Sequence, residues 1–186
     1  MNNELIRKAV HVILGLVFCL LPAVFSRGQI IFLAFFILGV FLAVRYFGLR
    51  FRTHRVPRQS HGEIYYALGL ILSAFFFLPH HVLAFQYGIL ILALADAAAS
   101  LAGSMFGQSK IAIFNNNKTW AGTDVFFIVS FLIFLFLILF QGHGSLFVGV
   151  LITLILTLTE GFLTKGLDNL FLPLIASLLL KLMIGL

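Results

Sequence analysis

Long apolar stretches separated by short polar segments make up almost the whole chain. A membrane-spanning helix needs about 20 consecutive, mostly apolar residues. About seven stretches approach or reach that length, at residues 9–25, 29–47, 65–79, 82–103, 124–140, 145–163 and 170–185. The pattern therefore predicts an all-α protein, a polytopic bundle of about seven transmembrane helices.

The first stretch has an alternative interpretation as a secretory signal peptide, because Arg7 and Lys8 precede an apolar core that ends near Pro22. No clear small-x-small cleavage site follows this core, so a retained helix is favoured.

Composition excludes a soluble globular protein. Hydrophobic residues make up 62% of the 186 positions and charged residues only 10%, against roughly 25% charged residues in ordinary soluble domains. So few polar groups could not form a water-exposed surface, and the lipid bilayer is the expected solvent of one domain covering residues 1–186. The single cysteine, Cys19, excludes an intrachain disulfide and a cysteine-rich metal site.

The distribution of cations predicts the orientation. Twelve Lys and Arg face six Asp and Glu, which gives a net charge of +6. We attribute this excess to the Lys/Arg bias of cytoplasmic loops rather than to nucleic-acid binding. Almost all the cations fall in the N-terminal segment, in segment 45–58, and around residues 110–118 and 165. These segments, including the N-terminus, are predicted to be cytoplasmic, in either the cell membrane or the endoplasmic reticulum.

The acids are few enough to consider one by one. On this topology they lie in, or within a turn or two of, the cytoplasmic face, and they are Glu4, Glu63, Asp96, Asp124, Glu160 and Asp168. The predicted outer turns contain no acid. Acids, lysines and a glycine-rich loop on one face predict chemistry on a water-soluble, anionic substrate presented from the cytosol.

Asp96 lies in a run of small residues, ALADAAASLAGSMFG, at 93–107. Spacings of four, three and four place Asp96, Ser100, Gly103 and Gly107 on one helical face. A tight seam between packed helices would explain the small residues. A carboxylate at this depth is costly unless it is paired, and more often marks an ion or substrate site, so a functional role is favoured for Asp96.

The loop QSKIAIFNNNKTWAGTD, at 108–124, is the longest polar segment after the arginine-rich one. Its two lysines supply ammonium groups, backbone N–H groups near Gly122 could point at an anion, and Thr123 could cap a helix that starts at Asp124. A phosphate-binding loop and a solvated connector are both compatible with this sequence.

Polar residues also mark both ends of the chain. At the N-terminus, Arg7, Lys8 and His11 form either a substrate-binding group or a cationic anchor in which Glu4 pairs with Lys8.

Near the C-terminus, Glu160 is followed by FLTKGLDN at 162–169, which places Asp168 and Asn169 at the entrance to the last helix. These two residues either cap that helix or contribute a second carboxylate for metal binding or proton transfer. Glu63 opens the third apolar stretch, where it stabilises the helix N-terminus or takes part in catalysis.

Five motifs, read in order, extend over nearly the whole chain: RKAVH (7–11), GEIYYALG (62–69), DAAASLAGSMFGQSKI (96–111), NKTWAGTD (117–124) and EGFLTKGLDNLFLP (160–173). In this combination the chain resembles the family of CTP-dependent lipid kinases that includes dolichol kinase, phytol kinase and the yeast-type diacylglycerol kinase. The resemblance implies that the functional positions of the family correspond to Arg7, Lys8, Asp96, Gly103, Gly107, Lys118, Thr119, Gly122, Asp168 and Asn169.

The activity implied is attack of a membrane lipid alcohol on the γ-phosphate of CTP, which gives a lipid monophosphate and CDP. The alcohol is a polyprenol or dolichol, a phytol-like prenol, or diacylglycerol. Phosphoryl transfer mainly requires positioning of the reactants and neutralisation of charge. Mg²⁺ is expected on Asp96 with Asp168 or Glu160, because hard oxygen ligands suit this ion.

Two sets of residues follow from this hypothesis. The nucleotide contacts are assigned to Arg7, Lys8, Ser100, Gly103, Gly107, Lys110, Lys118, Thr119 and Gly122. Catalytic roles are assigned to Asp96, Lys118, Glu160, Asp168 and Asn169, and the base that takes the hydroxyl proton stays open among Asp168, Glu160 and Glu63.

Two other functions compete with the kinase. The middle motifs are also similar to the cytidylyltransferases that make CDP-diacylglycerol, but the C-terminal signature of those enzymes, with Lys-Arg, Lys-Asp and Pro-Gly-His-Gly-Gly, is absent. A small ion-coupled transporter would place acids near the bilayer midplane, on paired broken helices. The acids here cluster at one predicted face and no inverted repeat occurs, so a lipid kinase is favoured.

Overall fold

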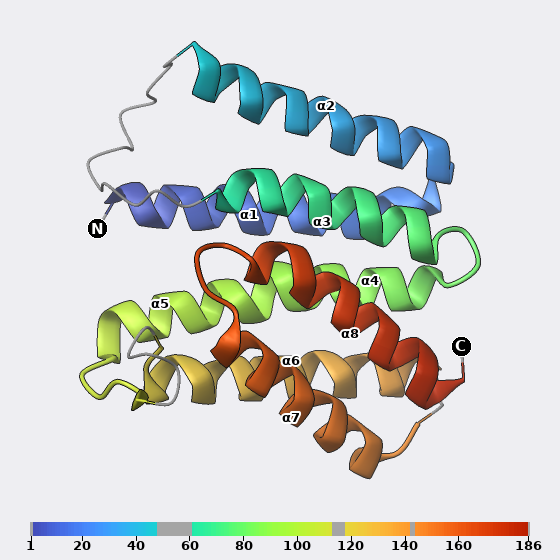
Figure 1. The fold of residues 1–186 in the computed structure, drawn as a ribbon. Helices are drawn as coiled ribbons and strands as arrows, with labels where there is room; N and C mark the ends of the chain where they lie inside the picture. Colours follow the sequence, from blue (N-terminus) through green and yellow to red (C-terminus); the bar gives the residue numbers. More distant parts are fainter. Residues whose placement is uncertain (1, 48–60, 113–117, 142–143, 186) are drawn as a thin grey trace.

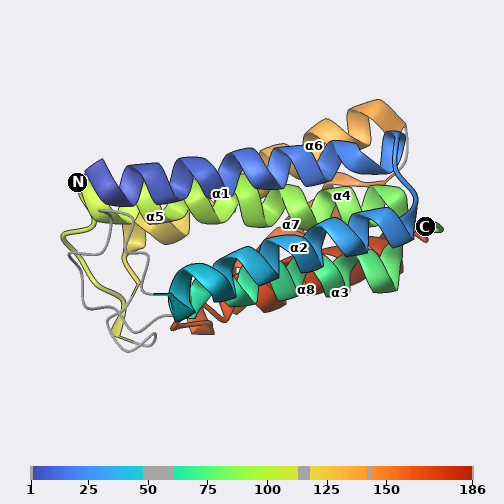
Figure 2. The ribbon, with the colours of Figure 1, turned by 90° about the horizontal axis from the view of Figure 1, so that it is seen from above.

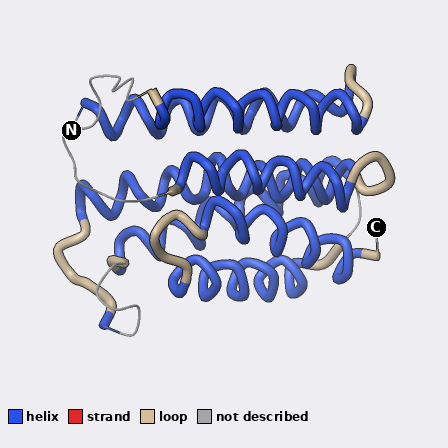
Figure 3. The backbone as a smooth tube through the Cα atoms, turned by 45° about the horizontal axis from the view of Figure 1, so that its top comes forward, coloured by secondary structure: helices blue, strands red, loops and turns tan. Residues whose placement is uncertain are grey.

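The computed structural model describes residues 2–47, 61–112, 118–141 and 144–185 (Figure 1). In chain order its elements are α1 (Asn2–Leu20), the 3-10 turn η1 (Leu21–Ala23), α2 (Arg27–Tyr46), α3 (Gly62–Phe77), α4 (Val82–Leu90), the π-helical turn η2 (Ile91–Asp96), α5 (Ala97–Phe106), α6 (Trp120–Gln141), α7 (Leu146–Phe162) and α8 (Asp168–Ile184). No strand occurs in these ranges (Figure 3). Their only β-type pairing is an isolated antiparallel bridge between Lys110 and Thr119.

Seven helical rods correspond to the predicted apolar stretches within the described residues, because α4, η2 and α5 form one continuous rod. The prediction of an all-α fold is confirmed. Two internal boundaries shift by four or five residues: α1 ends at Leu20 rather than at the predicted residue 25, and α6 begins at Trp120 rather than at the predicted residue 124.

Local capping explains two of the helix starts. The Ser26 side chain accepts a hydrogen bond from the backbone N–H of Gln29, while the Gln29 side chain accepts one from the backbone N–H of Ser26. This reciprocal capping box satisfies donors that a helix N-terminus otherwise leaves open. Ser145 caps α7 by accepting from the N–H of Val148.

Consecutive rods run in opposite directions (Figures 1 and 2). The starts of α1, α3, α6 and α8 and the ends of α2, α5 and α7 therefore lie together, at what we call the site end. The two views also show that α5 projects beyond the starts of α3 and α8.

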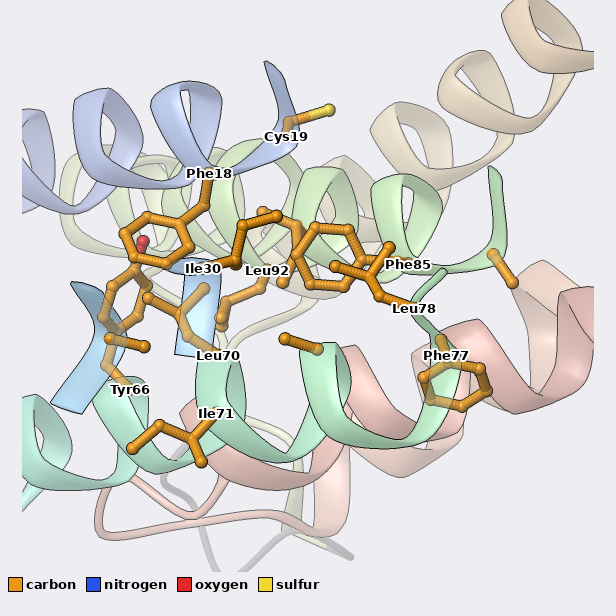
Figure 4. Packing of buried hydrophobic residues seen from close by; sticks show 14 residues of the cluster. Phe18, Cys19, Ile30, Tyr66, Leu70, Ile71, Phe77, Leu78, Phe85 and Leu92 are labelled. Atoms are coloured by element: carbon orange, nitrogen blue, oxygen red, sulfur yellow. The ribbon is translucent and has the colours of Figure 1, made fainter. Parts of the chain in front are cut away.

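The α4–η2–α5 rod is central because it contributes to both hydrophobic clusters of the protein. Phe85 and Leu92 belong to the cluster with α1, α2 and α3 that Figure 4 shows. Tyr87 and Ile91 belong to the cluster with α6, α7 and α8. On the side facing α8, Gly88 allows the two backbones to approach closely, as small residues do between membrane helices.

The outside of the bundle is apolar. Phe32 and Phe36 of α2 and Phe147 of α7 are 70%, 64% and 72% exposed, which suits a lipid environment better than water. Among the described residues, three segments have the length and composition to cross a membrane: Arg27–Tyr46, Val82–Phe106 and Trp120–Leu137. Lys8–Ala23, Gly62–Phe77 and Leu146–Phe162 are shorter apolar helices. Seven crossings and a cytoplasmic N-terminus therefore stay predictions.

Candidate active site

A nearly buried ion pair joins the first helix to the central rod. Lys8 Nζ of α1 lies 2.9 Å from Asp96 Oδ2, and the two side chains are 12% and 6% exposed. The described partner of Lys8 is thus Asp96, while the side chains of Glu4 and Arg7 lie outside the described residues. Because a buried carboxylate requires compensation, this pair explains how Asp96 can be ionised in an apolar bundle.

Asp96 lies well inside its own helical rod, at the end of η2 and before α5. Ten residues separate it from Phe106 at the end of α5, which is nearly three helical turns. Since α5 projects beyond the starts of α3 and α8 (Figure 2), Asp96 is close enough to residues at those helix starts for its charge to act on Asp168.

A second group of charges surrounds Lys118. Its ammonium forms a hydrogen-bonded ion pair with Glu160 Oε1 of α7 and lies 3.9 Å from Asp168 Oδ2 of α8. Burial alone lowers the pKa of Lys118, but the charges of Glu160, Asp168 and Asp96 outweigh burial and raise the pKa overall. Lys118 therefore stays charged, and its ammonium attracts one acid from each of three helical rods: Asp96, Glu160 and Asp168.

Asp168 is in a less favourable environment for its charge. It precedes the apolar stretch of the last helix, and its pKa is raised by burial and by the nearby charge of Asp96, against the smaller effects of Lys118 and Lys8. Two lysines face three carboxylates in this cluster, so one negative charge is left over when all three acids are ionised. The cluster of Lys8, Asp96, Lys118, Glu160 and Asp168 is called the charged cluster below.

The Lys118 backbone is fixed by the loop that leads into α6. The N–H of Ile111 donates to the carbonyl of Lys118 at 2.9 Å, and the N–H of Trp120 donates to the carbonyl of Ser109 at 3.2 Å. Lys110, on the partner strand of this bridge, is exposed. The loop is thus paired with itself at the point where Lys118 enters the cluster.

The predicted cap of α6 was wrong. Thr119, not Thr123, caps the helix, because its Oγ1 accepts the N–H of Gly122 at 3.2 Å and the helix starts at Trp120. The N–H groups of Trp120 and Gly122 are therefore already used within the protein and do not point at an anion as expected.

The glycines of the small-residue face leave room for the Thr119 side chain. A Cβ on Gly107 would lie 2.6 Å from Thr119 Cγ2, and one on Gly103 would lie 3.0 Å from Thr119 Oγ1. A Cβ on Gly122 would lie 2.9 Å from the carbonyl oxygen of Ala99 in α5. These glycines allow α6 and its preceding loop to pack closely on α5, while Ser100 on the same helix is only half-buried.

Asn169 connects α8 to α3. Its Nδ2 donates to the carbonyl of Gly62 at 2.9 Å, and its N–H donates to Asp168 Oδ1 at 3.0 Å. Gly166, at φ +90°, turns the chain just before α8, and a Cβ there would lie 2.7 Å from the Cα of Gly62. The N-cap position is occupied by Leu167, so neither Asp168 nor Asn169 caps the helix.

The remaining acids lie outside this cluster. Glu63 at the start of α3 and Asp124 in α6 are both exposed, and no ion pair of either is found among the described residues. Their exposure distinguishes them from the three buried or half-buried acids around Lys118.

The cluster offers oxygen donors for a divalent cation. Within the described residues, no group of three or more His, Cys, Asp and Glu side chains is placed to hold a metal ion. Glu160 Oε2 is buried and has no hydrogen-bond partner among those residues. Mg²⁺ usually takes only one or two protein carboxylates, with phosphate oxygens and water completing its shell. Two carboxylates of the cluster, Asp96 and Asp168, would meet that requirement.

Sequence reasoning missed the π-helical turn that ends at Asp96 and the contacts of His11 and Tyr66 beside it. His11 Nε2 lies 3.2 Å from the carbonyl of Leu92, and the Tyr66 hydroxyl donates to the carbonyl of His11 at 3.1 Å. No glycine, proline or polar residue in the ILALAD segment at 91–96, apart from Asp96, signals the turn.

Comparison with known proteins supports the resemblance described above. The chain is 28% identical to the phytol kinase of Synechocystis sp. over an alignment of 202 positions, which covers 95% of this chain and 78% of that protein. It is 32% identical to phytol kinase 1, chloroplastic, of Arabidopsis thaliana over 71% of this chain, and 29% identical to probable phytol kinase 2, chloroplastic, of Glycine max over the same share. The aligned parts cover 47% and 45% of the two plant proteins.

No protein-family model and no solved structure matches the chain. The phytol kinase homologues confirm the resemblance to the lipid kinase family that includes them.

Proposed function

We propose that this homologue of phytol kinases transfers the γ-phosphate of CTP to a membrane-dissolved alcohol of the prenol type, on the cytoplasmic face of its membrane. The observation that carries the proposal is the charged cluster, in which Lys118 holds Glu160 and Asp168 beside the Lys8–Asp96 pair. The names of the homologues favour a phytol-like prenol over dolichol or diacylglycerol as the acceptor.

The cluster suits exchange of ionic partners. In the structure each lysine is held by carboxylates, so the charges largely cancel within an apolar bundle. Binding of a nucleoside triphosphate would draw the ammonium groups of Lys8 and Lys118 away from the carboxylates and toward phosphate oxygens. There they would offset the negative charge that develops during transfer. The released carboxylates would then be available to a cation.

Asp96 and Asp168 are the proposed ligands of Mg²⁺, with Glu160 as a neighbouring oxygen donor. When bound, the ion would neutralise phosphate charge and orient the γ-phosphate. Residues of this chain do the rest: Thr119 and the glycines around it hold the Lys118 loop on α5, and Asn169 holds the start of α8 against α3.

In the reaction, the oxygen of the alcohol forms a bond to the γ-phosphorus and the bond from that phosphorus to the β–γ bridging oxygen breaks. The hydroxyl proton passes to a carboxylate and CDP leaves with the bridging oxygen. The proton acceptor of this proposal is one of Asp168, Glu160 and Glu63.

The test uses the purified protein in lipid nanodiscs with CTP labelled at either the α- or the γ-phosphate. Phytol, a polyprenol and diacylglycerol serve as acceptors, and unlabelled ATP, GTP and UTP as competitors. We expect γ-label, and no α-label, in a phytol-type product. Asp96→Asn should abolish transfer, while Asp124→Asn, an exposed acid of α6 at the same end, should retain it.

Other results would refute the proposal in distinct ways. Incorporation of α-label with release of pyrophosphate would establish a cytidylyltransferase. Suppression of γ-label transfer by unlabelled ATP to the same extent as by unlabelled CTP would refute the assignment of CTP. Ion flux in proteoliposomes without nucleotide turnover would favour the transporter.

A further inference from the structure

The central rod is not a regular helix where it passes the charged cluster. Residues Ile91–Asp96 form a π-helical turn between α4 and α5. In such a turn each backbone N–H bonds the carbonyl five residues earlier instead of four, and the turn accommodates extra chain at a cost that neighbouring contacts must offset. Asp96 is its last residue, so the geometry of the turn determines where the Asp96 carboxylate points.

Two residues of α1 contact this turn on one helical face. Lys8 pairs with Asp96 at its end, and His11, three residues after Lys8, places Nε2 3.2 Å from the carbonyl of Leu92. A carbonyl oxygen only accepts, so Nε2 must carry the hydrogen. In a regular α-helix the Leu92 carbonyl would instead accept the N–H of Asp96, four residues later. The imidazole thus bonds a carbonyl whose partner changes between the two helix types.

Tyr66 of α3 fixes His11 in turn. Its hydroxyl donates to the His11 carbonyl at 3.1 Å, and the centroids of the two rings are 4.3 Å apart. Tyr66 is buried in the cluster between α1, α2 and α3 (Figure 4). Gly15 allows α1 to pack closely against η2 and Tyr66, because a Cβ at this position would lie 2.4 Å from Ala93 Cβ and 3.3 Å from the Tyr66 hydroxyl.

We propose that His11 and Tyr66 are positioning residues that hold the π-helical turn and thereby direct Asp96 toward Lys8 and the nucleotide–metal site. The chemical part of this inference rests on the proposed kinase function, whereas the structural part does not. If the turn relaxed to an α-helix, a one-residue shift of register would rotate Asp96 about 100° around the helix axis, away from Lys8.

The kinetic test compares three variants with a matched control. His11→Phe keeps a ring but removes the donor, His11→Gln restores an N–H donor at a similar reach, and Tyr66→Phe removes only the hydroxyl. His80→Phe is the control, because His80 is exposed in the turn between α3 and α4, at the opposite end of the bundle (Figure 1).

We expect His11→Phe to lower kcat by about 10- to 100-fold, the range for misplacement of a catalytic group by about 1 Å. The KM for the alcohol should stay the same. His11→Gln should recover most of the loss, and His80→Phe should match the wild type. If His11→Gln is as impaired as His11→Phe, the donor is not what matters and the proposal is overturned.

A second measurement does not depend on activity. Hydrogen exchange of the backbone amides at 91–97, followed by mass spectrometry in nanodiscs, reports the turn directly. His11→Phe and Tyr66→Phe should accelerate this exchange and His80→Phe should not. Unchanged exchange in both variants would overturn the positioning role. Accelerated exchange in a protein whose wild type transfers no phosphate would instead refute the proposed function and leave the structural role standing.

Discussion

The contact between α4 and α8 gives a quantitative test of the packing. In a Gly88→Ala variant the added Cβ would lie 2.3 Å from the carbonyl oxygen of Pro173 and 2.2 Å from Ser177 Oγ. Ordinary van der Waals contact begins at 3.4 Å, so the methyl group is 3.4 − 2.3 = 1.1 Å too close to Pro173. The serine side chain can rotate, but the carbonyl belongs to the backbone, so α8 itself must move.

Overpacking of this kind costs about 1–3 kcal/mol, while replacing glycine by alanine inside a helix recovers up to about 1 kcal/mol. Because the clash is with a backbone atom, the upper part of the overpacking range, about 2–3 kcal/mol, applies. After the gain in helix propensity, Gly88→Ala should lower the free energy of unfolding by about 1–2 kcal/mol. Gly39→Ala in α2 is the matched control. Apart from its chain neighbours and the nearby backbone of α2, no atom lies within 4 Å of its added Cβ, so Gly39→Ala should stabilise the protein by about 0.5–1 kcal/mol.

Cys19 provides the assay. It is the only cysteine of the chain and its side chain is buried in the cluster between α1, α2 and α3, so a thiol-reactive fluorogenic maleimide reports unfolding without further labelling. The two variants should shift the midpoint of thermal unfolding in opposite directions. A Gly88→Ala midpoint at or above that of the wild type would refute the close contact between α4 and α8.

Three further predictions concern charges and buried hydroxyls. Lys118→Met should destabilise the protein by about 3 kcal/mol, since it removes the partner of buried Glu160. Adding Glu160→Gln to this variant should restore most of the stability, and a double variant as unstable as Lys118→Met would contradict the pairing. Ser130→Ala should leave the unfolding midpoint unchanged or raise it, because Ser130 Oγ is buried without a partner among the described residues; a clear loss of stability would reveal a bound water instead. The raised pKa of Asp168 means that the folded state binds the proton of this carboxyl more tightly than the unfolded state does. Protonation of Asp168 therefore stabilises the folded state at low pH, and this stabilisation is lost as the pH rises through the folded pKa. Asp168→Asn should therefore stabilise the protein most near neutral pH, and the gain in unfolding midpoint should shrink as the pH is lowered; a gain that grows on acidification would contradict the assignment.

The helices could be predicted from the sequence because the signal for each is local. A continuous apolar run determines that a segment is helical and where its middle lies, whatever its neighbours do. Polar capping residues such as Ser26 and Gln29 then determine where a helix begins. The start of α6 was less predictable because Thr119 and Thr123 are both suitable caps, and the bridge between Lys110 and Thr119 selects the earlier one.

The site could be predicted in its residues but not in its contacts. An acid inside an apolar stretch must have a partner, so Asp96 and Glu160 were recognisable as candidates from the sequence. Which cation each one meets depends on how distant helices are rotated and aligned against each other. Lys8 meets Asp96 across 88 residues, and Lys118 meets Glu160 across 42. The π-helical turn depends on such contacts too, so its own residues carry no signal for it.

These separations also have a consequence for biogenesis. Lys8 is synthesised long before Asp96, and Lys118 long before Glu160 and Asp168. Lys8 therefore enters the membrane region before any carboxylate of the charged cluster, and Lys118 enters before its ion-pair partners Glu160 and Asp168. Each ammonium has to remain at the aqueous interface until its partner arrives. Because Asp168 of α8 follows the other acids of the cluster in the chain, the cluster is complete only when α8 packs against the other helices. A ribosome-bound chain that stops before α7 would therefore have Asp96 available to Lys8, but would present Lys118 to the insertion machinery without Glu160 and Asp168.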